Sequence, residues 1–311
     1  KPGAGVMAER IRLGTTSLEV SPLGLGTWAW GDRLFWGYGQ GYRDPDLERA
    51  FRVSLELGVT FLDTAEIYGN GYSEQLIGQF SRGCREQVQI ATKIMPFPWR
   101  LGPQATRQAL LASLKRLAIP QVDLYQIHWP LPPMAIEVWM EWLVPLVQQG
   151  LTRAVGVSNY SASQLRRAHQ ALAQYGIPLA SNQVHYSLLH RDPEANGVLQ
   201  ACRELGVTLI AYSPLGMGLL TGKYSEEQVP PGPRGWQAAA TLRKKAPLLQ
   251  RLRQLAEQYG KTPAQVALNW LLCQGVVPIP GAKNARQAQE NAGALGWRLT
   301  PEDVHSLGLL A

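Results

Sequence analysis

Residues 60–69 read Thr-Phe-Leu-Asp-Thr-Ala-Glu-Ile-Tyr-Gly, an apolar run that changes abruptly to acidic and aromatic residues before a glycine. Such a run predicts a buried strand that leads into a loop. In a parallel sheet with helices on both faces, ligands bind where polar residues appear at the carboxyl ends of strands, and Asp63 and Tyr68 are so placed. Because an unperturbed tyrosine has a pKa of about 10, Tyr68 would need a neighbouring cation to stabilise its phenolate.

A unit of strand, polar or glycine-rich loop and helix-period segment recurs along the chain, which is the pattern of successive βαβ crossovers. We predict strands at residues 23–26, 60–64, 88–93, 122–128, 154–158, 179–186, 208–213 and 276–280. Predicted helices include residues 46–57, 104–117, 136–149, 162–175, 195–205 and 263–273. Eight strands that alternate with helices favour an α/β fold of the (β/α)8 TIM-barrel type over an open doubly wound sheet.

Local signals add detail to this barrel. The turn residues 14–17 predict an opening β-hairpin that closes the barrel floor. Ser161 and Thr262 are predicted helix N-caps, because a glutamine follows each of them three residues later. Extra helices are expected after the seventh and eighth strands. Three segments exceed ordinary loop length and are expected to be lids or binding loops, namely residues 28–44, 95–103 and 216–241.

Length and composition limit the function classes. The 311 residues can bury one large core, so residues 7–311 are expected to form a single domain, and residues 1–6 are interpreted as a remnant before Met7. The net charge of +7 comes from scattered Lys and Arg residues, so no nucleic-acid partner is expected. Three cysteines without CxxC spacing and five histidines without ligand spacing predict no disulfide framework and no metal site. The absence of a long apolar run or a signal peptide predicts a cytoplasmic protein that does not bind membranes.

Four chemically active side chains fall at neighbouring strand ends. Lys93 ends the third predicted strand and His128 ends the fourth. Because the carboxyl ends of barrel strands share one rim, Asp63, Tyr68, Lys93 and His128 are expected to converge there. The Lys93 ammonium would lower the pKa of Tyr68, and Asp63 would keep Lys93 charged.

Each of these residues also has a purely structural interpretation. Asp63 could cap a turn, Lys93 could extend along an apolar surface, Tyr68 could be a loop aromatic, and His128 could be a satisfied buried histidine. Taken singly, each structural interpretation is the better one. The coincidence of all four at strand ends favours an active site.

These motifs resemble the aldo-keto reductase superfamily over nearly the whole chain. The resemblance rests on Asp63-x4-Tyr68, Lys93 at a strand end, His128-Trp129-Pro130 and Gly156-Val157-Ser158-Asn159. The segments 22–32, 180–184 and 278–284 look like the plastid and cyanobacterial branch, and the potassium-channel β subunits are more distant. The resemblance implies NADPH-dependent reduction of aldehydes and ketones to alcohols, with Tyr68 as general acid, Lys93 and Asp63 tuning it, and His128 orienting the carbonyl. Its cofactor is expected to be NADPH, because Lys283 and Arg286 offer cations for a 2′-phosphate.

The resemblance also assigns a cofactor to particular residues. Amide and hydroxyl groups after the fifth and sixth strands would bind the nicotinamide carboxamide, and an aromatic ring after the seventh strand would stack on the nicotinamide. The glycine-rich segment that follows would bind the pyrophosphate, and the start of the last helical region would bind the adenosine end of the cofactor. The full predicted cofactor set is Gly26, Thr27, Trp28, Asp63, Ser158, Asn159, Gln183, Tyr212, Ser213, Pro214, Leu215, Gly216, Gly218, Leu219, Lys223, Arg234, Gly281, Lys283, Gln287, Glu290 and Asn291.

The substrate side is predicted from tryptophans in the rim loops. Trp30, Trp99 and Trp129 are expected to line a pocket for an apolar or aromatic small-molecule carbonyl, although shielding of the nicotinamide would place aromatics there as well. Two rival functions stay open, and the oligomeric state is not specified by the sequence. The first rival is a slow-turnover NADP(H)-sensing protein that acts through a partner. The second is a barrel lyase or isomerase that uses no nicotinamide.

Overall fold

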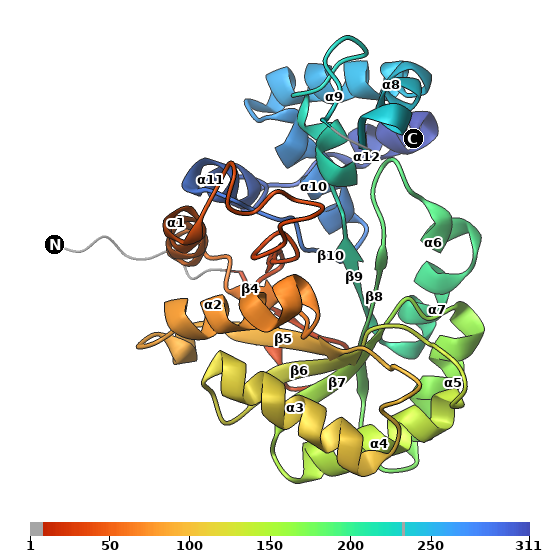
Figure 1. Cartoon of the computed structure of the whole chain (residues 1–311). Coiled ribbons are helices and arrows are strands. Elements are labelled where there is room, and N and C mark those ends of the chain that lie inside the picture. The colour runs from red at the N-terminus through yellow and green to blue at the C-terminus, as the bar shows by residue number, and fades with distance from the viewer. Residues whose placement is uncertain (1–8, 232–233) are drawn as a thin grey trace, which may run out of the picture.

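Eight parallel strands form a barrel in this chain, as the computed structural model shows for the described residues 9–231 and 234–311 (Figure 1). The strands are hydrogen-bonded in sequence order from β3 to β10. Gly26 also bridges to Gly281, and its N–H donates to the carbonyl of Pro280 at 3.0 Å, which closes the ring of strands. The strands are β3 (Gly24–Gly26), β4 (Phe61–Asp63), β5 (Gln89–Ile94), β6 (Val122–Ile127), β7 (Thr152–Ser158), β8 (Leu179–His185), β9 (Thr208–Tyr212) and β10 (Val277–Pro278).

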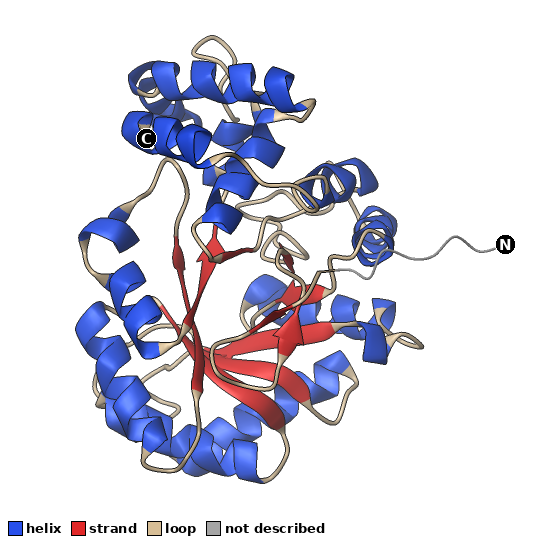
Figure 2. Ribbon diagram, turned by 180° about the vertical axis from the view of Figure 1, so that it is seen from behind, coloured by secondary structure: helices blue, strands red, loops and turns tan. Residues whose placement is uncertain are grey.

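Helices surround the strands, so the sheet is buried on its outer side (Figure 2). Within the described ranges they are α1 (Asp44–Glu56), α2 (Tyr72–Phe80), α3 (Pro103–Leu117), α4 (Ile136–Gln148), α5 (Ala162–Ala173), α6 (Asp192–Ala195), α7 (Val198–Leu205), α8 (Arg234–Lys244), α9 (Ala246–Tyr259), α10 (Pro263–Cys273), α11 (Ala285–Ala292) and α12 (Pro301–Leu310). Short 3-10 helices are η1 (Tyr68–Gly71), η2 (Arg85–Gln87) and η3 (Gly216–Thr221). Helices α8, α9 and α12 group together at one end of the molecule in Figure 1. None of the described helices is long and apolar enough to cross a membrane.

The predicted (β/α)8 barrel with its opening hairpin is confirmed. Strands β1 (Ile11–Arg12) and β2 (Glu19–Val20) pair antiparallel. Leu13, Leu18 and Val20 of this hairpin pack against inward-facing residues from the barrel strands, in a core separate from the helix-facing one. The interior of the barrel is therefore filled with apolar side chains on the hairpin side.

Helix boundaries follow the local signals in most places. Ser161 and Thr262 each accept a hydrogen bond from the N–H of the glutamine three residues on, and the glutamine side chains return the bond, so both predicted caps are confirmed. The helix predicted at 195–205 begins later, as α7 at Val198, because Gly197 has a φ of 83° and separates it from the short helix α6. Helix α2 was not predicted from the sequence. The predicted remnant at residues 1–6 lies outside the described residues.

Candidate active site

Asp63, Lys93 and Tyr68 form one hydrogen-bonded group at the carboxyl end of the barrel. Asp63 is the last residue of β4, Lys93 lies near the end of β5, and Tyr68 begins η1 just after β4. The Lys93 ammonium donates to Asp63 Oδ2 at 2.6 Å, to the carbonyl of Thr64 at 2.9 Å and to the Tyr68 hydroxyl at 3.1 Å. All three of its protons are therefore used, and the amine is fixed between a carboxylate and a phenol.

Burial sets the charges in this group. The side chains of Lys93 and Asp63 are 0 % and 2 % exposed. Burial lowers the pKa of Lys93, but the Asp63 carboxylate and the bonds from Lys93 to its partners outweigh it, so the pKa of Lys93 is raised and the amine stays charged. The ion pair thus presents a permanent positive charge to the Tyr68 oxygen.

Tyr68 keeps its proton more firmly than the sequence suggests. Burial raises the pKa of its phenol, and the Lys93 ammonium, which by itself lowers that pKa, offsets the effect only in part. The predicted lowering of the Tyr68 pKa by Lys93 is therefore present, but burial outweighs it and the net pKa is raised. A protonated phenol beside a fixed ammonium can still give up its proton, because the ammonium stabilises the phenolate that results.

His128 follows β6 and lies at the edge of the Tyr68 ring. The two ring centroids are 5.9 Å apart in an edge-on arrangement. Burial, together with the nearby Lys93 charge, lowers the pKa of His128 to about 3, so the imidazole is neutral at physiological pH. Its Nδ1 atom is buried and has no hydrogen-bond partner in the described structure. A buried polar atom without a partner at an active rim is typical of a group that a ligand completes.

Two amides hold the other oxygen of Asp63. Gln183 Nε2 donates to Asp63 Oδ1 at 2.8 Å, and Gln126 Nε2 donates to the same oxygen at 3.2 Å. The three residues lie on alternate strands, β4, β8 and β6, and so form one layer of the barrel interior. The sequence reasoning missed Gln126. It precedes His128 by two positions, so the period of two along β6 places both side chains on the inward face and could have identified it.

Asn159 connects three strand ends at the mouth. Its Nδ2 donates to the carbonyl of His128 at 3.1 Å and its Oδ1 accepts from the Tyr212 hydroxyl at 2.8 Å. Asn159 and Ser213 both have positive φ values, 61° and 49°. Tyr212 is half-buried and its ring stacks on His185, with 5.4 Å between centroids. The predicted nicotinamide residues Ser158, Asn159, Gln183 and Tyr212 therefore surround the mouth beside Lys93 and Tyr68.

The predicted pyrophosphate strap is a tight, partly exposed loop. Residues 213–223 include η3, in which Met217 and Gly218 have φ values of 54° and 99°, conformations that glycine adopts without strain. The Lys223 ammonium is exposed and lies 5.4 Å from the Tyr224 ring centroid. Arg234 begins α8, and its side chain lies outside the described part of the structure.

The residues predicted to bind the adenosine end of the cofactor form hydrogen bonds with one another. Asn284 caps α11 by accepting from the N–H of Gln287 at 2.9 Å, and Gln287 Oε1 accepts from the N–H of Lys283 at 2.8 Å. Asn291 donates to the carbonyl of Gly281 at 3.0 Å. Glu290, half-buried, accepts at its backbone carbonyl from the side chain of another helix.

Lys283 already interacts with the long loop after β3. Its ammonium donates to the carbonyl of Trp36 at 3.2 Å and lies 4.8 Å and 4.7 Å from the ring centroids of Trp36 and Tyr42. This cation joins the segment after β10 to the rim loop that carries Trp28 and Trp36. A phosphate at this position would compete with the aromatic rings for the same charge.

Two predicted residues that follow the first barrel strand are fully buried. Trp30 donates from Nε1 to the carbonyl of Ala282 at 3.0 Å, so its ring does not face a pocket, contrary to the prediction that it lines the substrate site. The Thr27 hydroxyl bonds to the carbonyl of Asp63 and to Ser73, so its side chain supports the turn, and its predicted contact with the cofactor stays a prediction. Gly26 is required by barrel closure, because a Cβ there would lie 2.8 Å from the carbonyl oxygen of Ile279.

The other predicted rim tryptophans are exposed. Trp28 is 39 % exposed and stacks on Phe35, Trp129 is 40 % exposed, and Trp99 is 75 % exposed and stacks on Phe97 at 4.6 Å between centroids. The loop that carries Trp99 is tied down by Arg100, which forms two hydrogen bonds, of 2.9 Å and 3.0 Å, to the Glu66 carboxylate. An aromatic rim therefore stands beside the polar cluster.

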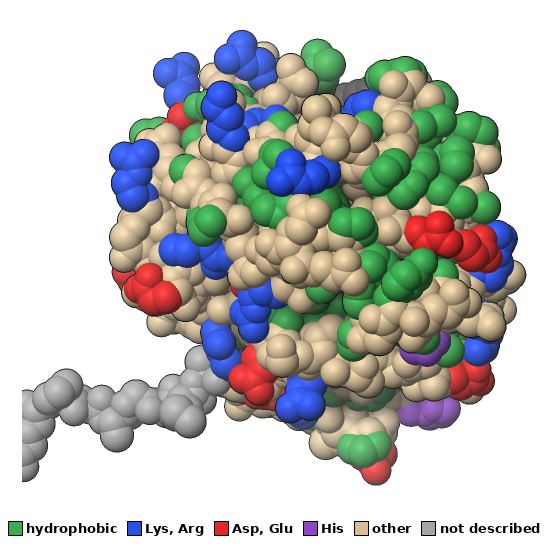
Figure 3. Space-filling model, turned by 90° about the horizontal axis from the view of Figure 1, so that it is seen from below, with side chains coloured by type: hydrophobic (Ala, Val, Ile, Leu, Met, Phe, Trp, Pro, Cys, Tyr) green, Lys and Arg blue, Asp and Glu red, His purple; other side chains and the backbone are tan. Residues whose placement is uncertain are grey.

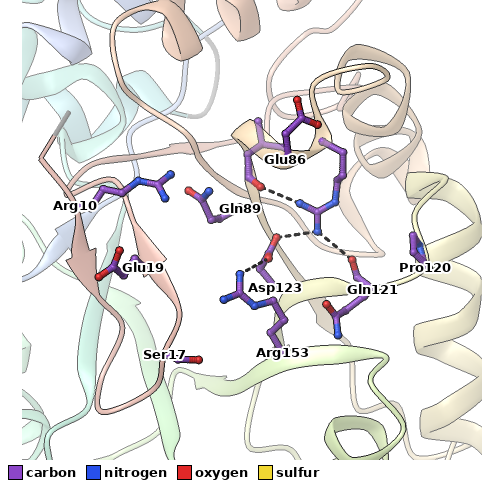
Figure 4. Close-up of a pocket in the computed structure, with 11 residues that line it drawn as sticks. Arg10, Ser17, Glu19, Glu86, Gln89, Pro120, Gln121, Asp123 and Arg153 are labelled. Carbon is purple, nitrogen blue, oxygen red and sulfur yellow. Dashed lines mark hydrogen bonds and ion pairs between the residues drawn. The ribbon is translucent and has the colours of Figure 1, made fainter. Parts of the chain in front are cut away.

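A pocket of about 560 Å³ lies at the opposite end of the barrel, where the hairpin meets the starts of β5, β6 and β7 (Figure 4). Asp123 is its central carboxylate and bonds to Arg85 at 2.9 Å and Arg153 at 3.2 Å. Three arginines and three acidic residues line the pocket, so their formal charges balance. In Figure 3, Lys and Arg side chains are spread over the visible face among other residue types. Neither feature has the chemistry of the Lys93 cluster.

Comparison with known proteins identifies relatives along nearly the full chain. The sequence model of the Aldo/keto reductase family matches residues 22–308. The chain is 44 % identical over 309 residues to the chloroplastic pyridoxal reductase of Arabidopsis thaliana, covering 95 % of this chain and 84 % of that protein. It is 33 % identical to the solved structure of the thermostable aldo-keto reductase Tm1743 in complex with epalrestat, with a TM-score of 0.80 over 97 % of this chain and all of that one. An aldo-keto reductase from Klebsiella pneumoniae in complex with NADPH is 28 % identical, with a TM-score of 0.75 over 97 % of this chain and 95 % of its own.

Proposed function

Because this chain belongs to the aldo/keto reductase family and is an oxidoreductase, we propose that it reduces aldehydes and ketones to alcohols with NADPH, with Tyr68 as the general acid. The observation that carries this proposal is the Lys93 ammonium, placed 3.1 Å from the Tyr68 hydroxyl and 2.6 Å from Asp63. When bound, NADPH supplies a hydride. The chain supplies the proton and the electrostatic stabilisation of the developing alkoxide.

Each member of the cluster has a separate role in this proposal. Tyr68 holds its proton at rest because burial raises its pKa, and it donates that proton to the carbonyl oxygen. Lys93 stabilises the phenolate that remains, and Asp63 keeps Lys93 in place. His128 is neutral, so it can donate a hydrogen bond to the same carbonyl oxygen without adding a second positive charge beside Lys93.

The residues around the mouth fit a nicotinamide cofactor. Asn159 and Gln183 present amide groups, Tyr212 presents a half-buried ring, and the unpaired Nδ1 of His128 lies at the same rim. The solved relatives from Klebsiella pneumoniae include complexes with NADPH and with NADP and acetate. We assign the preference for NADPH over NADH to Lys283, which would exchange its contacts to Trp36 and Tyr42 for a 2′-phosphate.

An aromatic aldehyde of the pyridoxal class is the substrate we propose to test first. The Arabidopsis relative carries the name pyridoxal reductase, and the exposed rings of Trp28, Trp99 and Trp129 offer stacking surfaces for a planar substrate. Cys84, Cys202 and Cys273 are free thiols, which favours a reducing, cytoplasmic location, whereas that relative is described as chloroplastic. The location stays a prediction.

The proposal is tested by steady-state kinetics with NADPH and a panel of small, aromatic and pyridoxal-type aldehydes. The wild-type protein should consume NADPH, and Tyr68→Phe should lower kcat by at least about 10²-fold while NADPH still quenches tryptophan fluorescence with an unchanged Kd. Wild-type turnover in Tyr68→Phe would show that the acid is another group. Tight NADPH binding with negligible turnover on every carbonyl, together with a specific protein partner, would favour the NADP(H)-sensing alternative.

A further inference from the structure

Asp63 accepts hydrogen bonds from two glutamine side chains in addition to the Lys93 ammonium. Its Oδ2 accepts from Lys93, and its Oδ1 accepts from both Gln183, at 2.8 Å, and Gln126, at 3.2 Å. Gln126 is fully buried and Gln183 is 2 % exposed, so water does not substitute for either amide. A buried carboxylate keeps its orientation and charge only while such donors stay in place.

Gln126 also fixes the orientation of the Gln183 amide. Its Oε1 accepts from Gln183 Nε2 at 3.2 Å, while its own Nε2 lies 3.4 Å from the carbonyl of Thr92. Both protons of Gln183 Nε2 are therefore directed into the barrel, one to Asp63 and one to Gln126. No described residue donates to Gln183 Oε1. The amide oxygen is thus left as an acceptor for an N–H group brought by a ligand.

We propose that Gln126 is a positioning residue that serves both halves of the site: it donates to the Asp63 carboxylate, and it turns the Gln183 amide so that its oxygen can accept from the carboxamide N–H of the nicotinamide. The inference rests on the proposed function, because it needs a nicotinamide at this mouth. An aliphatic residue could fill this buried position on β6 without burying polar atoms. The proposed role explains the amide there, because an amide both donates and accepts a hydrogen bond.

The test compares two cofactors in each variant. NADPH carries the carboxamide N–H, whereas its 3-acetylpyridine analogue has a methyl group in that place. The wild type should bind NADPH more tightly than the analogue. Gln126→Met keeps a side chain of similar volume but loses the hydrogen bonds to Asp63 and Gln183. In this variant the affinity for NADPH should fall roughly tenfold, and the affinity for the analogue should not change. The Kd values are measured by quenching of tryptophan fluorescence.

The matched control is Gln89→Met, the same change at another buried glutamine of the barrel, whose Oε1 accepts from Thr60 at 2.8 Å. It should leave the cofactor preference at the wild-type value. Because the preference is a ratio of two affinities in one protein, partial unfolding of a variant does not mimic the effect. Equal loss of both cofactors in Gln126→Met, or no loss of either, would overturn the positioning role. Failure of the wild type to bind NADPH at all would instead overturn the proposed function.

Discussion

Replacing Asp63 by Asn leaves the Lys93 ammonium buried without a counter-ion while conserving the size of the side chain. In the native protein the two groups are 2.6 Å apart, and their side chains are 0 % and 2 % exposed. Removal of one partner from a buried ion pair costs about 3–5 kcal/mol, because the remaining charge is uncompensated. Since a folded domain is typically stabilised by about 5–15 kcal/mol in total, the variant should be far less resistant to denaturant.

The stability lost in Asp63→Asn should become smaller as the pH rises. In the wild type the pKa of Lys93 is raised, so its contribution is present at neutral pH and is lost only above the unfolded pKa of about 10.4. In Asp63→Asn the largest effect that raises the pKa of Lys93 is removed while burial, the strongest effect of all, still lowers it, so the pKa of Lys93 in the folded state should fall below that of the unfolded chain. The unfolded state then binds more protons between these two values, so the free energy of unfolding rises with pH. The variant should regain stability as the pH approaches about 10.

Urea unfolding followed by tryptophan fluorescence measures both effects, at about pH 7 and about pH 9.5. The double variant Asp63→Asn with Lys93→Met is the control: it should recover much of the lost stability at neutral pH, lose the pH dependence, and stay inactive. If Asp63→Asn is within about 1 kcal/mol of the wild type at neutral pH, or if its deficit does not shrink at alkaline pH, the buried-charge reasoning is wrong.

Three further outcomes are expected. Arg100→Leu removes both hydrogen bonds to Glu66 and should raise KM for aromatic aldehydes several-fold with little change in kcat. Limited proteolysis should show earlier cleavage at residues 95–103. A KM equal to that of the wild type would contradict the role of Arg100 as an anchor of this loop. His128, with a pKa of about 3 against an ordinary 6.5, should show no imidazole titration by NMR above about pH 5. Because the unfolded chain binds a proton that the folded protein does not, the free energy of unfolding should fall as the pH drops from 6.5 toward 3, and His128→Asn should reduce this pH dependence. Gly78→Ala should cost about 1–3 kcal/mol in thermal unfolding, because its Cβ would lie 2.5 Å from a backbone carbonyl of α3, whereas the matched helical change Gly308→Ala, with its nearest atom at 3.7 Å, should be neutral or stabilising.

The repeating local pattern is what makes the barrel predictable. Strand and helix positions follow from hydrophobic period and from caps such as Ser161 and Thr262, which depend on residues a few positions apart. The position of Asp63, Lys93 and His128 at strand ends is also a local property, and parallel strands bring their ends together whatever the loops do. The sequence alone therefore indicated both the fold and the residues that converge.

Tertiary structure decided which groups are buried and which bonds they make. Trp28 and Trp30 are two residues apart in the same loop, yet one is exposed and the other donates a hydrogen bond to Ala282, because a segment 252 positions away covers it. The raised pKa of Tyr68 has the same origin, since desolvation depends on atoms from distant strands and no pattern in the residues around Tyr68 reports it. Local periodicity fixes where an element runs, but distance and burial are set by contacts between residues far apart in the chain.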